Sequence, residues 1–367
     1  MRIGIDAREL TNKPAGKGQY VGKVIQAWAQ KDSVQLILYI HAGTVLPDAY
    51  RFNGAVTVIE VKGKGIAWHV QVSRRLNSDS VTVYFAALSY LSALVNVVPT
   101  VTVVHDLAVF QRGIVHNRKS YFIEKLTLKS AVRRSAAVVS VSKSTAKDLM
   151  SYTNINSSKV TVIPIAPLSL VHTGPRVIRK ERTYILFVGT LEPRKNVEVL
   201  FRAYAALPDT TREGYHLRLV GKTGWGGFDY KKLAIELGIE KTVEFCGYVN
   251  DADLPYLYSH AVVFVYPSLY EGYGVPLIEA MAAGTPVITS NNSSLPEVVG
   301  VNGITLDARD VLGFTAAIAG IISREELFEQ YSLRGMLRSK EFNWERITEE
   351  ILTICKKVSG IVKVDDN

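Results

Sequence analysis

Short runs of β-branched and aromatic residues recur along the first half of the chain, separated by loops and by segments with helical spacing of apolar residues. Such runs predict buried strands, and helical spacing predicts amphipathic helices. The first strand is followed by a glycine-containing loop and a predicted helix over residues 20–30. The predicted strands of this half cover residues 2–6, 35–40, 56–61, 81–85, 100–104, 137–141 and 159–163.

A second series of the same kind begins at residue 184 and has its first helix near 197–207. Alternating strands and helices predict parallel sheets with helices on both faces, so we expect an α/β protein with two doubly wound, Rossmann-like domains. They span residues 1–170 and 171–344, joined through the Pro- and Gly-containing stretch 166–182, and a helix near 345–360 packs back on the first domain. The strands predicted in this series cover residues 184–188, 216–220, 243–246, 262–266 and 287–289.

Composition narrows the class of protein. The 367 residues are 47% apolar and 21% charged, which excludes a disordered chain, and two cysteines cannot form a disulfide framework or a four-cysteine zinc site. We therefore expect a reducing compartment, and the charged residues 1–13 do not resemble a signal peptide. The uncharged stretch 80–104 is long enough to cross a bilayer, but its β-rich ends favour a buried strand–helix–strand unit over a membrane segment.

Charge is unevenly distributed. Residues 1–170 contain 21 Lys and Arg and 9 Asp and Glu, a net +12, whereas residues 171–367 contain 22 and 25, a net −3. This asymmetry indicates an anionic partner for the first domain, for which nucleic acid, anionic lipid and a phosphorylated substrate are candidates. The chain has no aromatic-rich RNA motif and no helix-turn-helix pattern, so nucleic acid is the least favoured.

Two glycine-containing loops resemble nucleotide-binding motifs but depart from them. The loop with Gly16 and Gly18 lacks the third glycine of a dinucleotide fingerprint, because that position is Val21. Its glycines fit either an amide nest for one phosphate or a simple turn. The segment Gly221-Lys222-Thr223 lacks the first glycine of a phosphate-binding loop. Neither NAD binding nor a P-loop nucleoside triphosphatase is expected.

Several charged residues follow predicted strands, where ligands of doubly wound domains bind. Arg194 and Lys195 precede a helix, where cations oppose the helix dipole, and they become favourable if an anion lies between them. Glu271 lies on a glycine-rich loop and Glu279 early in the next helix, so both can bind hydroxyls of one ligand; a capping and an exposed glutamate are the alternative. His105, with Asp106 beside it, is either a ligand-binding residue or a buried structural histidine.

A possible metal motif is assigned to a helix end. Asp251 and Asp253 form an Asp-x-Asp pattern that can hold a divalent ion beside a diphosphate. A helix is predicted to begin at Leu254, so a capping aspartate explains the pattern. The scattered histidines lack metal-ligand spacing, and we expect no metal site.

These motifs together resemble the GT-B glycosyltransferases of family 4. The family's Glu-x7-Glu signature matches Glu271 to Glu279, and matching segments occur in family order at 5–8, 105–107, 189–196, 221–225, 245–249 and 293–298. The similarity covers most of the chain and is greatest to the branch with mannosyltransferases of bacterial O-antigen assembly. It implies two domains facing each other across a cleft.

The resemblance also implies roles for matching residues. His105, Glu271, Arg194 and Lys195 would act in catalysis, with Arg194 and Lys195 on the donor diphosphate and His105 beside the sugar. Glu279 would bind the ribose. The remaining substrate-binding positions would be Gly16 and Gly18 at the distal phosphate, Asp106, Tyr248 and Val249 along the nucleobase, and Gly272, Tyr273 and Gly274 at the hexose.

The expected activity is therefore metal-independent, retaining hexosyl transfer, with a nucleotide sugar as co-substrate and no cofactor. GDP-mannose is the first choice of donor and a UDP-hexose the alternative; a catalytically silent scaffold is a further alternative. The acceptor is expected to be a growing glycan or a lipid-diphosphate-linked glycan at the cytoplasmic face of a membrane. Two basic, partly apolar regions of the first domain suit an anionic membrane surface or are solvated helix faces. One contains Arg112, Arg118, Lys119, Lys125, Lys129, Arg133 and Arg134 interleaved with Tyr121, Phe122, Ile123 and Leu126, and the other contains Lys62, Lys64, Ile66, Trp68, Arg74 and Arg75.

Overall fold

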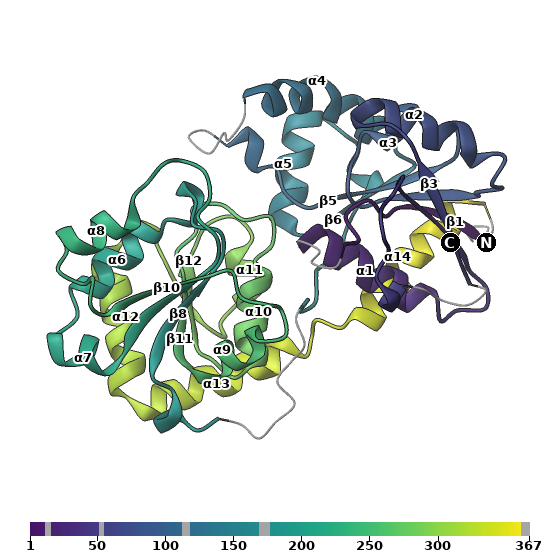
Figure 1. Cartoon of the computed structure of the whole chain (residues 1–367). Coiled ribbons are helices and arrows are strands. Elements are labelled where there is room, and N and C mark those ends of the chain that lie inside the picture. Colours follow the sequence, from purple (N-terminus) through teal and green to yellow (C-terminus); the bar gives the residue numbers. More distant parts are fainter. Residues whose placement is uncertain (12–15, 51–54, 112–117, 169–176, 361–367) are drawn as a thin grey trace. The chain divides into compact units, whose positions relative to one another are not determined.

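Each half of the chain folds around a parallel β-sheet in the computed structural model, which describes residues 1–11, 16–50, 55–111, 118–168 and 177–360. The chain divides into two compact units (Figure 1). The first holds the described residues up to Leu168 and those from Asn343 onward, and the second holds the described residues from 177 to Phe342. The predicted α/β class with two Rossmann-like domains is confirmed.

The sheet of the first unit has the order β3-β2-β1-β4-β5-β6-β7. β1 lies between β2 and β4, so strands are added on one side of β1 and then on the other. Helices α1 and α14 cover one face, and α2–α5 cover the other (Figure 1). The strands are β1 (Arg2–Asp6), β2 (Gln35–His41), β3 (Val56–Val61), β4 (Val83–Ala86), β5 (Thr100–Val104), β6 (Ala137–Ser140) and β7 (Val160–Val162). The helices are α1 (Gly16–Trp28), α2 (Gly65–Leu76), α3 (Ser92–Val95), α4 (Arg118–Arg134), α5 (Lys143–Thr153) and α14 (Trp344–Val358).

The sheet of the second unit has the order β10-β9-β8-β11-β12-β13 and reverses in the same way between β8 and β11. Its strands are β8 (Tyr184–Val188), β9 (His216–Val220), β10 (Val243–Gly247), β11 (Ala261–Tyr266), β12 (Val287–Ser290) and β13 (Ile304–Leu306). Its helices are α6 (Val197–Ala205), α7 (Asp209–Gly214), α8 (Tyr230–Glu236), α9 (Leu254–His260), α10 (Val275–Ala282), α11 (Leu295–Val299), α12 (Val311–Ser323) and α13 (Glu325–Ser339). β11 is buried along its whole length, as its unbroken apolar run predicts.

The uncharged stretch 80–104 folds as β4, α3 and β5 in the interior of the first sheet. The strand–helix–strand interpretation is therefore confirmed, and the alternative of a membrane segment is wrong. Within the described residues, no helix combines the length and the apolar character needed to cross a bilayer.

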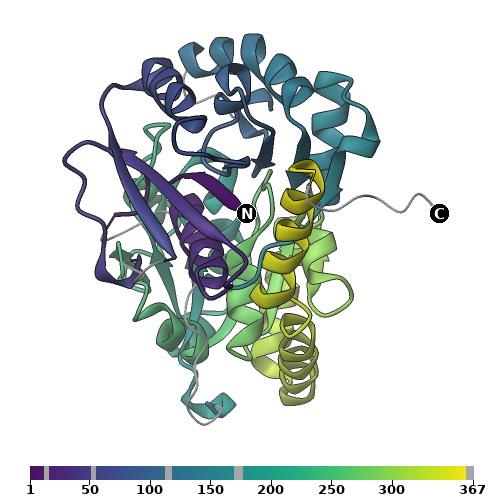
Figure 2. The ribbon, with the colours of Figure 1, turned by 90° about the vertical axis from the view of Figure 1, so that its right-hand side faces the viewer.

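The last helix, α14, belongs to the first unit and lies beside α1 (Figures 1 and 2). Its Ile351 and Leu352 are fully buried. The indole Nε1 of Trp28 on α1 donates to the carbonyl of Thr348 at 2.9 Å, and Nε1 of Trp344 donates to the carbonyl of Pro167 at 2.8 Å. Apolar burial and two indole hydrogen bonds thus hold α14 in place.

Candidate active site

The carboxyl ends of β8 and β11 are adjacent because these two strands pair at the point where the sheet order reverses. Loops that follow such strands meet at one place, which is where doubly wound domains bind ligands. The backbone N–H of Leu269, after β11, donates to the carbonyl of Arg194, after β8, at 2.7 Å. The side chain of Asn196 donates to the carbonyl of Pro267 at 3.0 Å. The sheet topology therefore joins two segments about 75 residues apart in the sequence.

Arg194 and Lys195 lie in η5 (Pro193–Lys195), a single 3-10 turn. Asn196 then takes a left-handed conformation with φ of 55°, and α6 begins at Val197. The two cations therefore precede the helix, as the sequence indicates, and they do so in a 3-10 turn of their own. The side chain of Lys195 is only 7% exposed, and that of Arg194 is 23% exposed.

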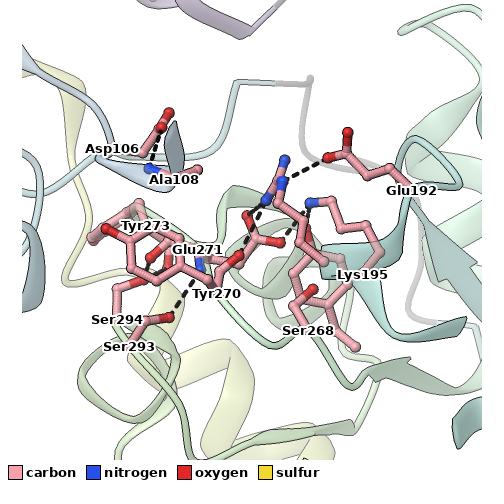
Figure 3. Close-up of polar contacts among 12 residues, drawn as sticks. Asp106, Ala108, Glu192, Lys195, Ser268, Tyr270, Glu271, Tyr273, Ser293 and Ser294 are labelled. Carbon is pink, nitrogen blue, oxygen red and sulfur yellow. Dashed lines mark hydrogen bonds and ion pairs between the residues drawn. The ribbon is translucent and has the colours of Figure 1, made fainter. Parts of the chain in front are cut away.

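The carboxylate of Glu271 lies between these two cations (Figure 3). Arg194 Nη1 donates to its Oε2 at 2.7 Å, and Lys195 Nζ donates to its Oε1 at 2.6 Å. Arg194 Nε also contacts Glu192 Oε1 at 2.6 Å. The sequence predicted an anion between Arg194 and Lys195, and in this structure the protein itself supplies one.

Glu271, Lys195 and Arg194 stabilise one another in their charged forms. Burial acts to raise the pKa of Glu271, but Lys195 and Arg194 outweigh it and lower that pKa to about 2. Burial lowers the pKa of Lys195, and Glu271 opposes this shift. Lys195 also donates to the hydroxyl of Tyr266, whose pKa burial raises well above its usual range. Tyr266 stays protonated, and it is a member of the site that sequence reasoning missed.

Serines of a later loop hold the Glu271 loop in place (Figure 3). Ser293 Oγ accepts from the backbone N–H of Glu271 at 2.9 Å, and Ser294 Oγ donates to the carbonyls of Glu271 and Tyr273. Gly274 has φ of 116°, and a Cβ there would lie 2.9 Å from Leu295, so this position requires glycine. The loop with Gly272, Tyr273 and Gly274 is buried, as a rigid binding surface requires.

Glu279 lies in α10, directly after this loop, and is 8% exposed. The hydroxyl of Tyr258 on α9 donates to its Oε2 at 3.0 Å. The structure therefore places both signature glutamates in the second unit, each buried and each hydrogen bonded.

Tyr248 and Val249 follow β10 at the edge of the same sheet. Tyr248 is 46% exposed, and the Lys222 ammonium lies 5.0 Å from the centre of its ring. Val249 is half-buried. An exposed aromatic ring next to a cation is a surface on which a planar base can stack.

His105 and Asp106 lie in the first unit, directly after β5. His105 Nε2 lies 2.8 Å from the carbonyl of Ala87, and burial, assisted by Lys17, lowers the pKa of the ring to about 4. The ring is neutral near pH 7, so Nε2–H donates to Ala87 and Nδ1 is an acceptor. Asp106 Oδ1 accepts from the backbone N–H of Ala108 at 3.1 Å.

His105 and Asp106 line a pocket of about 270 Å³ in this unit. Lys17, Tyr90, Ile123 and Glu124 also line it. The pocket is therefore partly apolar, with the ammonium of Lys17 and the carboxylates of Asp106 and Glu124 in its lining. Burial raises the pKa of Glu124. Glu124 was missed by sequence reasoning because it lies in a long basic helix.

Gly16 and Gly18 occupy the first turn of α1, where backbone N–H groups lack partners within the helix. The residues at 12–15 that precede them lie outside the described residues.

Asp253 occupies the N-cap position of α9, but its side chain makes no capping hydrogen bond, so the predicted capping explanation is wrong in this detail. Among the described residues there is no cluster of His, Cys, Asp or Glu suited to a metal ion.

The basic region within residues 62–75 is less exposed than its sequence indicates. Trp68 is fully buried on the inner face of α2, where the Arg8 guanidinium lies 4.1 Å from its ring centre. Lys62 and Lys64 are exposed, and Ile66 is 55% exposed. The prediction that Trp68 belongs to a surface is therefore wrong. Arg112 lies outside the described residues, as do the side chains of Arg118 and Lys119.

Comparison with known proteins agrees with this geometry. The family described as Glycosyl transferases group 1 matches residues 173–336, and Glycosyltransferase Family 4 matches residues 21–166. O-antigen chain mannosyltransferase B of Escherichia coli is 34% identical over 266 residues, which cover 70% of each chain. This chain belongs to glycosyltransferase family 4. It is therefore a glycosyltransferase, as the motifs predicted.

Solved structures share the fold of this family member. Sucrose-phosphate synthase from Thermosynechococcus elongatus superposes with a TM-score of 0.79 at 19% identity, covering 99% of this chain and 100% of that chain. HepE of Anabaena, solved with UDP and glucose, has a TM-score of 0.75 at 18% identity, covering 96% and 98%. The predicted GT-B class is confirmed.

Proposed function

We propose that this protein is a retaining mannosyltransferase that uses GDP-mannose and extends a glycan or lipid-linked acceptor in cell-surface polysaccharide synthesis. The observation that carries the proposal is the pair of the half-buried Arg194 and the buried Lys195, closed around a carboxylate at the carboxyl end of β8. Two cations at such a position suit a diphosphate. The likeness to an O-antigen mannosyltransferase supports the choice of mannose.

In this proposal the donor binds to the second unit. Arg194 and Lys195 hold the diphosphate, Glu279 holds the ribose, and Tyr248 with Val249 lies along the base. The hexose hydroxyls bind to Glu271 and to the backbone of Gly272, Tyr273 and Gly274. Gly16 and Gly18 supply backbone N–H groups to the distal phosphate. The nucleotide sugar is a co-substrate, and we propose that no cofactor or metal is needed.

Breaking the glycosyl–phosphate bond leaves negative charge on the diphosphate and positive charge on the sugar ring. Fixed donors in a buried site stabilise the first charge without reorganisation. We propose that the acceptor oxygen then attacks the same face of the sugar, so the anomeric configuration is retained. The new C1–oxygen bond replaces the C1–phosphate bond, and the acceptor's proton passes to the leaving phosphate. A covalent glycosyl–Glu271 adduct, if trapped, would contradict this path.

We propose that the acceptor binds in the pocket that contains His105 and Asp106. Its carboxylates accept hydrogen bonds from sugar hydroxyls, and its apolar walls suit the faces of a sugar ring. His105 is neutral, so it presents a hydrogen-bond acceptor at Nδ1 and adds no charge beside the developing sugar cation.

We propose a peripheral position at the cytoplasmic face of an anionic membrane, and helix α4 supports the membrane contact. Phe122, Ile123 and Leu126 are 58%, 53% and 76% exposed, and Lys125 and Lys129 are exposed beside them. A helix with exposed apolar and basic side chains suits an interfacial position. We expect binding to vesicles that contain phosphatidylglycerol, weaker binding at high salt, and little binding to neutral vesicles, as measured by cosedimentation.

A double variant tests the place of this contact. Lys125→Glu with Lys129→Glu should reduce vesicle binding strongly, whereas Lys231→Glu with Lys232→Glu on α8 is a matched control with two exposed lysines of the second unit. Equal binding to neutral vesicles, or equal losses in the two variants, would contradict this proposal.

The donor is tested with a panel of nucleotide sugars in the presence of EDTA. We expect binding and slow hydrolysis of GDP-mannose, measured by calorimetry and by release of GDP. Activity with a UDP-hexose instead would identify the alternative donor; HepE, which shares the fold, was solved with UDP and glucose. Activity that returns only with a divalent ion would contradict metal independence. Donor binding without turnover, even with membrane extract as acceptor, would indicate a catalytically silent scaffold.

A further inference from the structure

Glu279 is held by a residue that lies outside the family signature. Tyr258 is 1% exposed, and its hydroxyl donates to Oε2 of Glu279 at 3.0 Å across the packed helices α9 and α10. A buried hydroxyl needs a partner, and a buried carboxylate needs donors. The hydroxyl therefore has an acceptor, Oε2 of Glu279 has a buried donor, and the hydrogen bond helps to fix the orientation of the carboxylate.

Tyr258 is itself fixed from several sides. Its ring packs edge-on against Phe264 of β11, with ring centres 5.6 Å apart. Its backbone carbonyl accepts from Thr285 Oγ1, which in turn accepts from the guanidinium of the buried Arg182. Burial raises the pKa of Tyr258 well above its usual range, so the hydroxyl keeps its proton and acts as a donor throughout the neutral range.

We propose that Tyr258 is a positioning residue for the donor ribose. This inference rests on the proposed function, because it assumes that Glu279 binds the ribose hydroxyls. A carboxylate has about four lone-pair sites, so one hydrogen bond from Tyr258 leaves acceptor capacity for a ligand. Without the hydroxyl, Oε2 loses its donor from α9, and the carboxylate is held less firmly in the orientation that meets the vicinal hydroxyls of ribose.

The test compares Tyr258→Phe with the wild type on GDP-mannose and on its 2′-deoxyribose analogue. The wild type should prefer the ribose donor by about tenfold or more in kcat/KM, since a buried acceptor left without its donor is costly. Tyr258→Phe should raise KM for GDP-mannose severalfold, leave kcat almost unchanged, and reduce the preference for ribose to near unity. Glu279→Gln should also lose this preference.

Tyr184→Phe is the matched control. Tyr184 is a buried tyrosine of the same unit whose hydroxyl donates to the carbonyl of Leu257, the residue next to Tyr258, at 2.7 Å. This variant loses a buried hydrogen bond to α9 without touching Glu279, so it should keep the preference for ribose. Thermal unfolding of both variants measures how much stability each hydroxyl contributes.

The outcomes distinguish the positioning role of Tyr258 from the assignment of Glu279 to the ribose. If Tyr258→Phe keeps the wild-type preference, or if Tyr184→Phe loses it equally, the positioning role of Tyr258 is overturned while the proposed function stands. If the wild type and Glu279→Gln both fail to distinguish ribose from deoxyribose, the assignment of Glu279 to the ribose is overturned, and the inference falls with it.

Discussion

Replacing Lys195 with alanine is expected to lower kcat/KM by about 10²–10³, the usual effect of removing one fixed donor to a developing oxyanion. The ammonium is buried, lies 2.6 Å from Glu271 and also contacts Tyr266. It is therefore held rigidly in a place where water screens its charge weakly. Steady-state kinetics with the donor identified in the panel measure the effect.

The same replacement should destabilise the second unit. Glu271 would lose its more buried partner but keep Arg194, so the loss of stability should be smaller than the about 3–5 kcal/mol that a wholly unpaired buried charge costs. Lys232→Ala is the control, because Lys232 pairs with Glu236 on the surface of α8 with a side chain that is 73% exposed. Such a pair contributes little. A Lys195→Ala enzyme within threefold of wild-type kcat/KM would refute the assigned role.

Replacing Glu271 with glutamine is expected to have opposite effects on binding and on turnover. In the empty site Glu271 occupies the position between Arg194 and Lys195 that the proposal gives to the diphosphate. A diphosphate must therefore compete with this carboxylate. The neutral variant should bind GDP and inorganic diphosphate more tightly by about tenfold, equivalent to about 1.4 kcal/mol. Its turnover should fall sharply because the hexose loses its carboxylate partner.

A second readout for this variant is its stability in acid. The pKa of Glu271 in the folded protein is about 2, below the ordinary value of 4.5. The carboxylate therefore stabilises the fold above pH 4.5, and this contribution is lost as the pH falls from 4.5 to about 2. Glu271→Gln should lack this part of the pH dependence in denaturant unfolding. Weaker binding of diphosphate by the variant, or an unchanged pH dependence, would show that Glu271 is not the internal counter-ion.

Much of the fold is predictable because its central strands, such as β5 and β11, are buried on both faces. Apolar runs such as that of β11 have no other plausible environment, so the strands and their order along the chain follow from the sequence. β13 was missed because it has three residues, Ile304 to Leu306, and all are half-buried. So short a strand gives no periodic signal.

The sequence predicted individual residues of the site but not their contacts with one another. Arg194, Lys195 and Glu271 were each expected to bind a ligand, but their contact with one another depends on the pairing of β8 with β11. That pairing is a property of strand order in space, which periodicity does not report. Tyr258 and Tyr266 were missed because each lies in an aromatic, apolar run, where a hydroxyl group does not change the pattern.

The error at Trp68 has a different cause. The basic residues within 62–75 favoured a surface region. However, Trp68, Val72 and Leu76 recur at helical spacing, and they form the buried face of α2. This apolar spacing is visible in the sequence, and it determines which face of α2 is buried, whatever the charges on the other face.

The position of α14 has a consequence for how the protein is made. The described residues of the second unit run without a break from 177 to 342, so they are all available before α14 is translated. The first unit begins synthesis earlier, yet the face of β4, β5 and β6 that α14 covers stays bare until residues 344–358 leave the ribosome. During translation, the half of the protein that is made first is therefore completed last. For that interval its uncovered apolar face, including Trp28, is a surface for chaperones to protect.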